Sequence, residues 1–142
     1  MRKEFTIDQI HEIAKLVLHS MPTQKQSATI LCLTGDLGVG KTTLAQTIGK
    51  ILGIEQTMIS PTFVIMKRYA VIHNDFDALV HIDAYRLETP EEIVKLGWNS
   101  VIKNPRNLVV VEWPEKIKSV LPDEVLGVTI EHLDEKKRIL II

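Results

Sequence analysis

A glycine-rich segment with the chemistry of a phosphate-binding loop lies in the first third of the chain. It reads Gly-Asp-Leu-Gly-Val-Gly-Lys-Thr over residues 35–42 and matches the pattern G-x-x-x-x-G-K-[ST] at every fixed position. The glycines let the backbone curl so that its N–H groups point at phosphate oxygens, and the following helix directs its positive end at the same anion. Lys41 is expected to reach the β- and γ-phosphates, and the Thr42 hydroxyl is expected to bind Mg²⁺. An ordinary glycine turn would not require a lysine and a threonine here.

Two acidic residues at the ends of apolar runs are candidates for the metal side of such a site. Asp83 follows the apolar run 79–82, and Glu112 follows the run 108–111. A carboxylate at the exit of a buried strand is costly unless a cation neutralises it, and Mg²⁺ bound to phosphates needs such an acid. We expect Glu112 to be a metal ligand, and Asp83 to orient the attacking water or to hold the outer shell of the metal. With Lys41 they form the predicted catalytic set; the alternative for either acid alone is a partly solvated ion-pair partner.

Contacts to the rest of the nucleotide are expected from the loop and from peripheral elements. Ile7 and Lys137 are candidates for flanking adenine and ribose, although the basic run 136–138 also fits a solvated hairpin turn. Thr62 is expected to sense the γ-phosphate; the alternative is a loop residue fixed by Pro61. The predicted nucleotide-binding residues are Ile7, Leu37, Gly38, Val39, Gly40, Lys41, Thr42, Thr43, Thr62 and Lys137, and the predicted metal-binding residues are Thr42, Asp83 and Glu112.

Three larger side chains beside these candidates each have two interpretations. Arg86 is either a charge-stabilising finger for the phosphates or a surface partner of Glu88 or Asp83. Tyr85 and Trp113 each adjoin a candidate carboxylate, and they either line the site or pack in the core.

The elements that position these residues follow from hydrophobic spacing and turn signals. Apolar residues at helical spacing predict an amphipathic helix over 6–21, with Thr6 and Gln9 placed for a capping box. The run 28–34 is apolar nearly throughout, as in a buried central strand, and a helix over 42–52 follows the glycine loop. The remaining expected elements are an antiparallel pair 63–72 and 79–84, a helix from Thr89 to about Leu96, a strand 108–112, and a closing hairpin of 125–133 and 138–142.

Strand, glycine loop and helix form half of a βαβ unit, so the expected fold is α/β. We expect one P-loop NTPase domain over residues 1–142, with a mostly parallel central sheet flanked by helices and with antiparallel edge strands. The 142 residues suit one domain, and a content of 45% hydrophobic and 25% charged residues excludes disorder and coiled coil.

Charge and cysteine content limit the partners and the compartment. A net charge of −1 gives no general attraction to a polyanion, so a nucleic-acid binder that relies on a basic surface is not expected. Direct contact with nucleic acid through a local patch stays an open alternative. The single Cys32 and the polar N-terminus indicate the cytoplasm, and no apolar run approaches the roughly 20 residues of a membrane span. Of the histidines, only His81 adjoins a candidate site, and zinc is not expected.

The order of the motifs resembles the TsaE (YjeE) family from about residue 6 to residue 130. The matching segments are the loop 35–43, Ser60-Pro61-Thr62-Phe63, His81-Ile82-Asp83-Ala84-Tyr85-Arg86-Leu87, Pro90-Glu91-Glu92 with Leu96-Gly97, and Glu112-Trp113-Pro114. The resemblance implies a P-loop fold and a weak Mg²⁺-dependent ATPase that acts with TsaB and TsaD in threonylcarbamoyl modification (t6A) of the tRNA adenosine beside the anticodon. It also implies that the 60–62 loop senses the γ-phosphate, that Asp83 is an essential acid and that Glu112 is a metal ligand.

Two other functions fit a phosphate loop. A small-molecule kinase would need a lid with several arginines, and the chain has few to offer. A nucleotide-bound scaffold with negligible turnover could dispense with Asp83 and Glu112.

Overall fold

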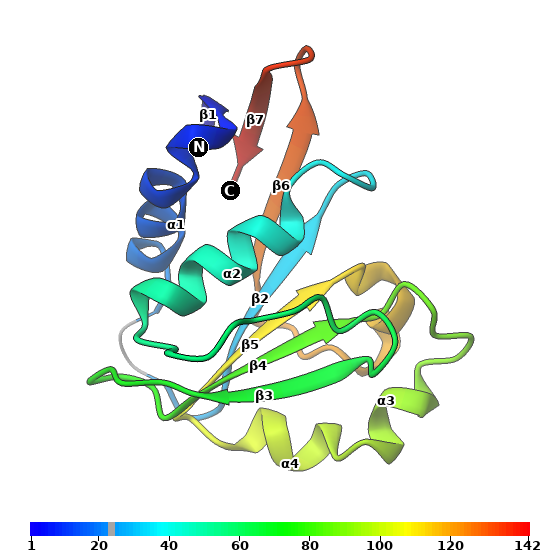
Figure 1. The fold of residues 1–142 in the computed structure, drawn as a ribbon. Coiled ribbons are helices and arrows are strands. Elements are labelled where there is room, and N and C mark those ends of the chain that lie inside the picture. Colours follow the sequence, from blue (N-terminus) through cyan, green and yellow to red (C-terminus); the bar gives the residue numbers. More distant parts are fainter. Residues whose placement is uncertain (23–24) are drawn as a thin grey trace.

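A mixed β-sheet runs through the molecule in the computed structural model, which describes residues 1–22 and 25–142 (Figure 1). In these residues seven strands lie in the order β1-β7-β6-β2-β5-β4-β3. Strands β6, β2, β5 and β4 are parallel to one another, and β1, β7 and β3 are antiparallel to their neighbours. The predicted α/β fold with a mostly parallel sheet and antiparallel edges is therefore confirmed. The strands are β1 (Arg2–Thr6), β2 (Thr29–Thr34), β3 (Met66–Ala70), β4 (Ala78–Asp83), β5 (Asn107–Glu112), β6 (Leu126–His132) and β7 (Lys137–Ile141).

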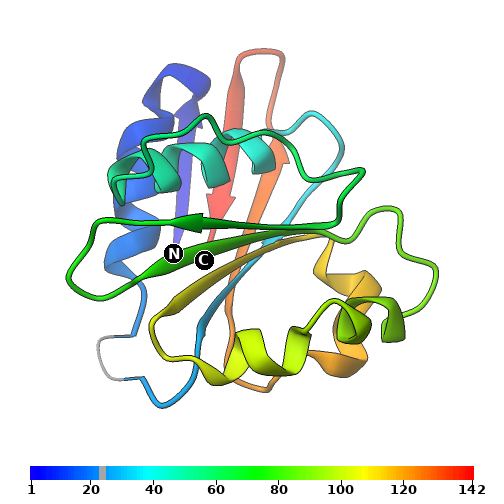
Figure 2. The same cartoon turned by 60° about the horizontal axis from the view of Figure 1, so that its bottom comes forward.

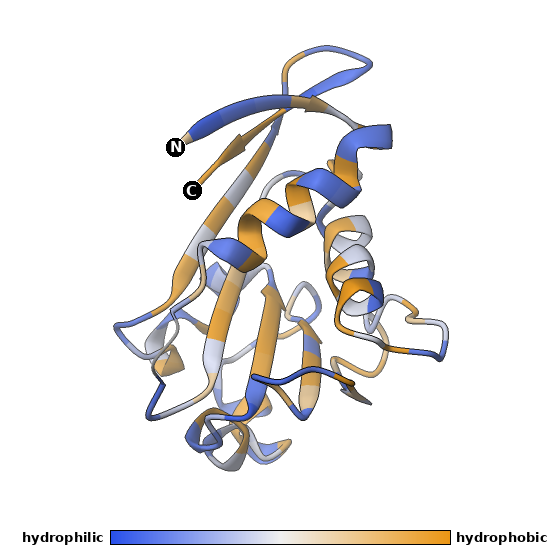
Figure 3. Cartoon of the chain, turned by 90° about the vertical axis from the view of Figure 1, so that its left-hand side faces the viewer, coloured by the Kyte–Doolittle hydropathy of each residue, from blue (hydrophilic) through white to orange (hydrophobic). Residues whose placement is uncertain are grey.

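Helices cover both faces of the sheet, and each face buries its own apolar core (Figures 1 and 2). Alternate residues of a strand point to opposite faces, so Leu31 and Leu33 of β2 pack toward α1 and α2 while Ile30 and Cys32 pack toward α4. Figure 3 shows the resulting apolar colouring along the central strands. The helices are η1 (Ile7–Gln9), α1 (Ile10–His19), α2 (Lys41–Ile51), α3 (Glu91–Lys95), α4 (Trp98–Lys103) and η2 (Pro114–Val120).

The N-terminal segment differs from its prediction. Residues Arg2–Thr6 form edge strand β1 against β7, a 3-10 turn follows, and the α-helix begins only at Ile10. The capping signal at Thr6 is real, because its N–H donates to Gln9 Oε1 at 2.9 Å, but it starts the 3-10 turn. The strand was missed because its partner β7 lies at the other end of the chain. The polar stretch predicted to end this helix includes residues 23–24, which lie outside the described residues.

Other boundaries differ less. Strand β3 is shorter than predicted because Ile65 has a positive φ of 69° and ends the preceding turn. Helices α4 and η2, of six and seven residues, were not predicted. Helix α3 begins at Glu91 with Pro90 as its N-cap, slightly later than predicted, while the expected capping contact is present: Glu92 Oε2 accepts the N–H of Thr89 at 2.9 Å. No helix within residues 1–22 or 25–142 has the length and apolarity to cross a membrane.

Candidate functional site

The glycine loop and both candidate acids meet at the carboxyl ends of the parallel strands. Strand β2 leads into the loop, and the sheet register places Asp83 of β4 directly beside Glu112 of β5. Gly40, the residue before α2, has a φ of +116°, a conformation that L side chains rarely adopt. A cleft of about 240 Å³ lies here, lined by Leu37, Gly38, Gly40, Lys41, Thr42, Thr43, Ser60, Thr62, Asp83, Glu112 and Trp113.

A larger hollow of about 800 Å³ lies near the other end of β2, where it is lined by Ser27–Ile30 and Glu124–Leu126 among others. Ligands of open α/β sheets bind outside the carboxyl ends of the strands. The smaller cleft is therefore the candidate site, and nearly all of the predicted phosphate and metal contacts line it.

The Lys41 ammonium lies within the curl of the loop. Its Nζ donates to the carbonyl oxygens of Gly35 and Asp36, the latter at 3.0 Å, and lies 4.2 Å from the centroid of the Trp113 ring. Burial lowers the pKa of Lys41 from its ordinary value, and the nearby negative charge of Glu112 opposes that shift. The cation therefore lies where phosphate oxygens could replace its present carbonyl partners.

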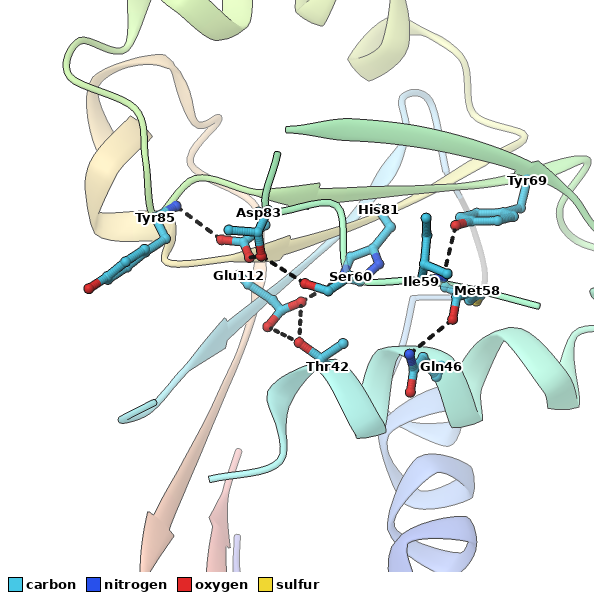
Figure 4. A network of polar contacts seen from close by, with 11 residues as sticks. Thr42, Gln46, Met58, Ile59, Ser60, Tyr69, His81, Asp83, Tyr85 and Glu112 are labelled. Atoms are coloured by element: carbon cyan, nitrogen blue, oxygen red, sulfur yellow. Dashed lines mark hydrogen bonds and ion pairs between the residues drawn. The ribbon is translucent and has the colours of Figure 1, made fainter. Parts of the chain in front are cut away.

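The Thr42 hydroxyl bonds the Glu112 carboxylate across the cleft (Figure 4). Its Oγ1 lies 2.8 Å from Oε1 and 3.0 Å from Oε2, and Glu112 is almost fully buried. A hydroxyl and a carboxylate in contact at the start of a phosphate-loop helix are hard oxygen donors of the kind Mg²⁺ prefers.

A third group, which the sequence analysis did not assign, completes the surroundings of Glu112. His81 of β4 is fully buried, and its Nε2 lies 2.6 Å from Glu112 Oε2. The period of two along β4 places His81 and Asp83 on the same face of the sheet. The sequence signal was this spacing, but the reach to Glu112 depends on the pairing of β4 with β5.

Asp83 contacts the segment that follows α2. Its Oδ2 accepts the Thr62 hydroxyl at 2.9 Å, and its Oδ1 accepts the N–H of Tyr85 at 3.0 Å. The hydroxyls of Ser60 and Thr62 lie 2.8 Å apart, and the Asp83 N–H donates to the Ile65 carbonyl at 2.9 Å. Asp83 therefore fixes the 60–65 segment beside the cleft.

Backbone strain borders the same cleft. Ile65 and Trp113 are the two non-glycine residues with positive φ in the part of the chain that is described, at 69° and 58°. Such conformations are costly for bulky residues and concentrate at functional sites. Trp113 lines the cleft and its ring lies 5.1 Å from that of Tyr85, which favours the site interpretation for Trp113.

Arg86 does not form the predicted surface ion pair among the described residues, and its alternative role as a finger for the phosphates stays a prediction. Its guanidinium lies 4.5 Å from the centroid of the Phe63 ring, and no ion pair joins it to Glu88 or Asp83. Phe63 is itself 81% exposed, so this contact lies at the surface beside the 60–65 segment.

The 3-10 turn η1 and the C-terminal strand β7 support the far side of the loop. A Cβ on Gly40 would lie 3.6 Å from Ile7 Cδ1 and 3.9 Å from Arg138 Nε, and Arg138 Nε donates to the Val39 carbonyl at 2.7 Å. In the described residues Arg138, rather than its neighbour Lys137, makes this contact, and Lys137 stays a prediction. Val39 itself is buried in the core, so it offers a nucleotide its backbone only.

The donor set fits Mg²⁺ held jointly by protein and phosphates. No group of three or more His, Cys, Asp or Glu side chains with the arrangement of a complete metal site occurs in the described part of the chain. Mg²⁺ uses one or two carboxylates, phosphate oxygens and water rather than an all-protein cage. Thr42 and Glu112 supply such a partial set, and Asp83 lines the same cleft.

Comparison with known proteins shows where the chain belongs. The family model described as threonylcarbamoyl adenosine biosynthesis protein TsaE matches residues 6–140. Proteins named tRNA threonylcarbamoyladenosine biosynthesis protein TsaE are similar to it: that of Rickettsia bellii is 41% identical over 78% of this chain and 74% of its own, and that of Rickettsia felis is 37% identical over 93% and 72%. The crystal structure of Bacillus subtilis YdiB superimposes with a TM-score of 0.74 at 27% identity, over 99% of this chain and 82% of that one. The chain is a member of the TsaE family, whose proteins take part in the biosynthesis of threonylcarbamoyladenosine in tRNA.

Proposed function

We propose that this protein is a Mg²⁺-dependent ATPase that acts with TsaB and TsaD in the threonylcarbamoyl modification of tRNA. The observation that carries the proposal is the contact between the Thr42 hydroxyl and the Glu112 carboxylate, 2.8 Å apart at the start of the phosphate-loop helix. This arrangement suits a bound metal ion next to phosphates, and a glycine turn without a ligand has no need of it.

The residues of the cleft have different roles in ATP hydrolysis. The loop N–H groups and Lys41 would bind the phosphates, and Thr42 and Glu112 would hold Mg²⁺, which would supply positive charge to the phosphate oxygens. Asp83 lies beside Glu112 in the sheet register, is bonded to Thr62 at 2.9 Å, and is the group we assign to orienting water.

The partner assignment rests on the family and on the surface beside the cleft. Ile59, Phe63 and Val64 are 58%, 81% and 57% exposed, and they flank the Thr62 hydroxyl that bonds Asp83. A segment of this kind is suited to a nucleotide-sensitive docking surface, because phosphate contacts at Thr62 would change the position of its apolar neighbours.

Phosphate release from Mg-ATP measures the proposed function directly. The protein alone is expected to turn over slowly, and added TsaB and TsaD are expected to change that rate. Glu112→Gln should abolish turnover both by the protein alone and with the partners. Glu91→Gln, which replaces a glutamate at the start of α3 on the other face of the sheet, should change neither rate. Turnover by the Glu112→Gln variant at the rate of the unsubstituted protein would contradict the proposal.

A further inference from the structure

We propose that His81 is a positioning residue that holds the Glu112 carboxylate in the orientation required for Mg²⁺, an inference that rests on the proposed function. The His81 ring is fully buried under the cleft, and its Nε2 lies 2.6 Å from Glu112 Oε2. His81 itself does not line the cleft, so it acts only through Glu112.

The place of His81 in the sheet favours an apolar residue. Leu79, two positions earlier on the same strand face, and Val110, its partner in the register, are both fully buried in the core. Burying a polar imidazole at such a position is unfavourable unless it is hydrogen-bonded. Because its one bonded atom reaches Glu112, that contact accounts for the imidazole.

The hydrogen bonds of Glu112 show why Thr42 alone does not orient the carboxylate. The Thr42 hydroxyl carries one proton and lies almost equally close to both carboxylate oxygens, at 2.8 and 3.0 Å. It therefore tolerates rotation of the carboxylate. The bond from His81 selects Oε2 and leaves Oε1 directed at Thr42, where the metal is expected.

The partners of the ring assign its tautomer. Nδ1 is buried and has no hydrogen-bond partner among the described residues, whereas Nε2 faces a carboxylate oxygen. A proton on Nε2 lets the ring donate to the carboxylate oxygen, whereas a proton on Nδ1 would leave a buried donor unsatisfied. Nε2 is therefore the ring nitrogen that carries the bonded proton.

Two substitutions separate positioning from packing. His81→Leu introduces an apolar side chain of similar size and removes the donor, and His81→Gln keeps an N–H close to the place of Nε2. The control is Thr29→Val, a change at a buried position of β2 far from the cleft, where the hydroxyl has no partner in the described residues. Each variant is assayed for ADP affinity with EDTA present, for the Mg²⁺ concentration that half-saturates Mg-dependent nucleotide binding, and for thermal unfolding.

In His81→Leu the half-saturating Mg²⁺ concentration should rise about 10- to 100-fold, the usual effect of losing a group that orients a metal ligand. ADP affinity without metal should stay unchanged, because the phosphate loop is intact. His81→Gln should recover most of the Mg²⁺ dependence, and Thr29→Val should match the unsubstituted protein. Equal losses of affinity with and without Mg²⁺, with no recovery in His81→Gln, would overturn the inference in favour of a purely structural role.

A second readout needs no nucleotide. In protein labelled with ¹⁵N-histidine, the His81 ring should show a protonated Nε2 and an unprotonated Nδ1, and the opposite tautomer would overturn the inference. Failure of the proposed function looks different, because the unsubstituted protein would then show no Mg²⁺ dependence of nucleotide binding, and the inference would fall with it. A normal Mg²⁺ dependence in both the unsubstituted protein and His81→Leu would overturn the positioning role alone.

Discussion

The Thr62 hydroxyl donates a hydrogen bond to Asp83 Oδ2 at 2.9 Å, which ties the segment after α2 to the carboxyl end of β4. Both residues line the cleft beside the phosphate loop. A γ-phosphate in that cleft would compete for the same hydroxyl, so we expect occupancy of the nucleotide site to be coupled to the position of the 60–65 segment. This is the kind of local ordering by which a nucleotide state becomes visible to a partner protein.

Removing the Thr62 hydroxyl should therefore uncouple partner binding from the nucleotide. For the unsubstituted protein we expect the affinity for a TsaB–TsaD complex to differ about 5- to 150-fold between the ADP and ATP-analogue forms, the usual range of such coupling. Thr62→Val should reduce this ratio toward one while ATP-analogue affinity changes much less. Titration calorimetry of the apo, ADP and ATP-analogue forms measures both, and Thr57→Val, at an exposed position of the same connection, is the control. Equal affinity of the unsubstituted protein in all three forms would contradict a nucleotide switch.

Substitutions of the two acidic residues, Asp83 and Glu112, should have different effects on binding and hydrolysis. Glu112 contacts Thr42 and His81, whereas Asp83 contacts Thr62 and Tyr85, so their surroundings already differ. Asp83→Asn should leave Mg-ATP binding nearly intact and lower hydrolysis about 10²- to 10⁴-fold, the range for loss of a general base. Glu112→Gln should instead remove the Mg²⁺ dependence of nucleotide binding.

Binding of Mg-ATP-analogue and single-turnover hydrolysis, measured side by side, check this division. Asp77→Asn serves as the control, because Asp77 lies at the other end of β4 and pairs with Arg106. If Asp83→Asn abolishes binding and Glu112→Gln does not, the two roles are exchanged.

Substitutions of Lys41 and Thr42 should distinguish the binding of phosphate charge from the binding of Mg²⁺. Lys41→Ala removes the ammonium beside the loop carbonyls and should weaken ADP binding at least about 10-fold, since a hydrogen bond to a charged group contributes roughly 1.5–3 kcal/mol. Thr42→Ala should impair hydrolysis that depends on Mg²⁺ and spare ADP binding in EDTA. Lys50→Ala, at the exposed end of the same helix, is the matched control. Turnover at the normal rate in either site variant would exclude the assignment.

The parts of the site that sequence predicts are those encoded locally. The loop 35–42 is one continuous motif, and Asp83 and Glu112 each end an apolar run, so parallel strands bring them to one edge. Thr62 follows Pro61 in a segment whose place beside Asp83 was not predictable, yet its hydroxyl was a candidate because this segment follows the phosphate-loop helix.

The parts that sequence does not predict depend on contacts between distant residues. His81 reaches Glu112 across 31 positions, and Arg138 reaches the Val39 carbonyl across 99. Strand β1 exists because Arg2–Thr6 pairs with β7, and its own residues carry a weak strand pattern next to a strong helical one. In each case the tertiary pairing decides, and local propensity does not contain it.

Cys32 should be chemically inert in the folded protein. Its side chain is buried in β2, and burial, with a smaller effect of Glu115, raises the pKa of the thiol to about 11. Because the thiolate is the reactive form, labelling by a disulfide reagent at pH 8 should be slow in the native state and complete in denaturant. Rapid stoichiometric labelling of the native protein would contradict this burial.

The same pKa shift gives a dependence of stability on pH. The unfolded thiol ionises near its ordinary value of 9.0 and the folded thiol near 11, so between these values the unfolded state binds fewer protons. The contribution to stability is therefore full below pH 9 and is lost as pH rises through the folded pKa. Between pH 8 and pH 10 the unsubstituted protein should lose on the order of 1 kcal/mol more unfolding free energy than Cys32→Ala does. Urea titrations at both pH values measure this double difference, in which the titration of the lysines and tyrosines cancels.

Gly35, the first residue of the phosphate loop, should tolerate no side chain. A Cβ there would overlap the Ile130 carbonyl oxygen of β6 and lie 2.8 Å from Val39 Cγ1, and the residue has a φ of +151°. Backbone atoms of a central strand cannot move aside cheaply, so Gly35→Ala should lower the unfolding free energy by about 2 kcal/mol or more, from crowding and backbone strain together. Gly127→Ala on the same strand β6 is the matched control, because a Cβ at Gly127 meets no described atom within 4 Å. We expect that variant to be neutral or slightly stabilising, through reduced entropy of its unfolded chain. Displacement of the loop in Gly35→Ala should also reduce ADP affinity, and this loss distinguishes the variant from a purely destabilising substitution. Equal stability of the two alanine variants would refute the close approach of the loop to β6.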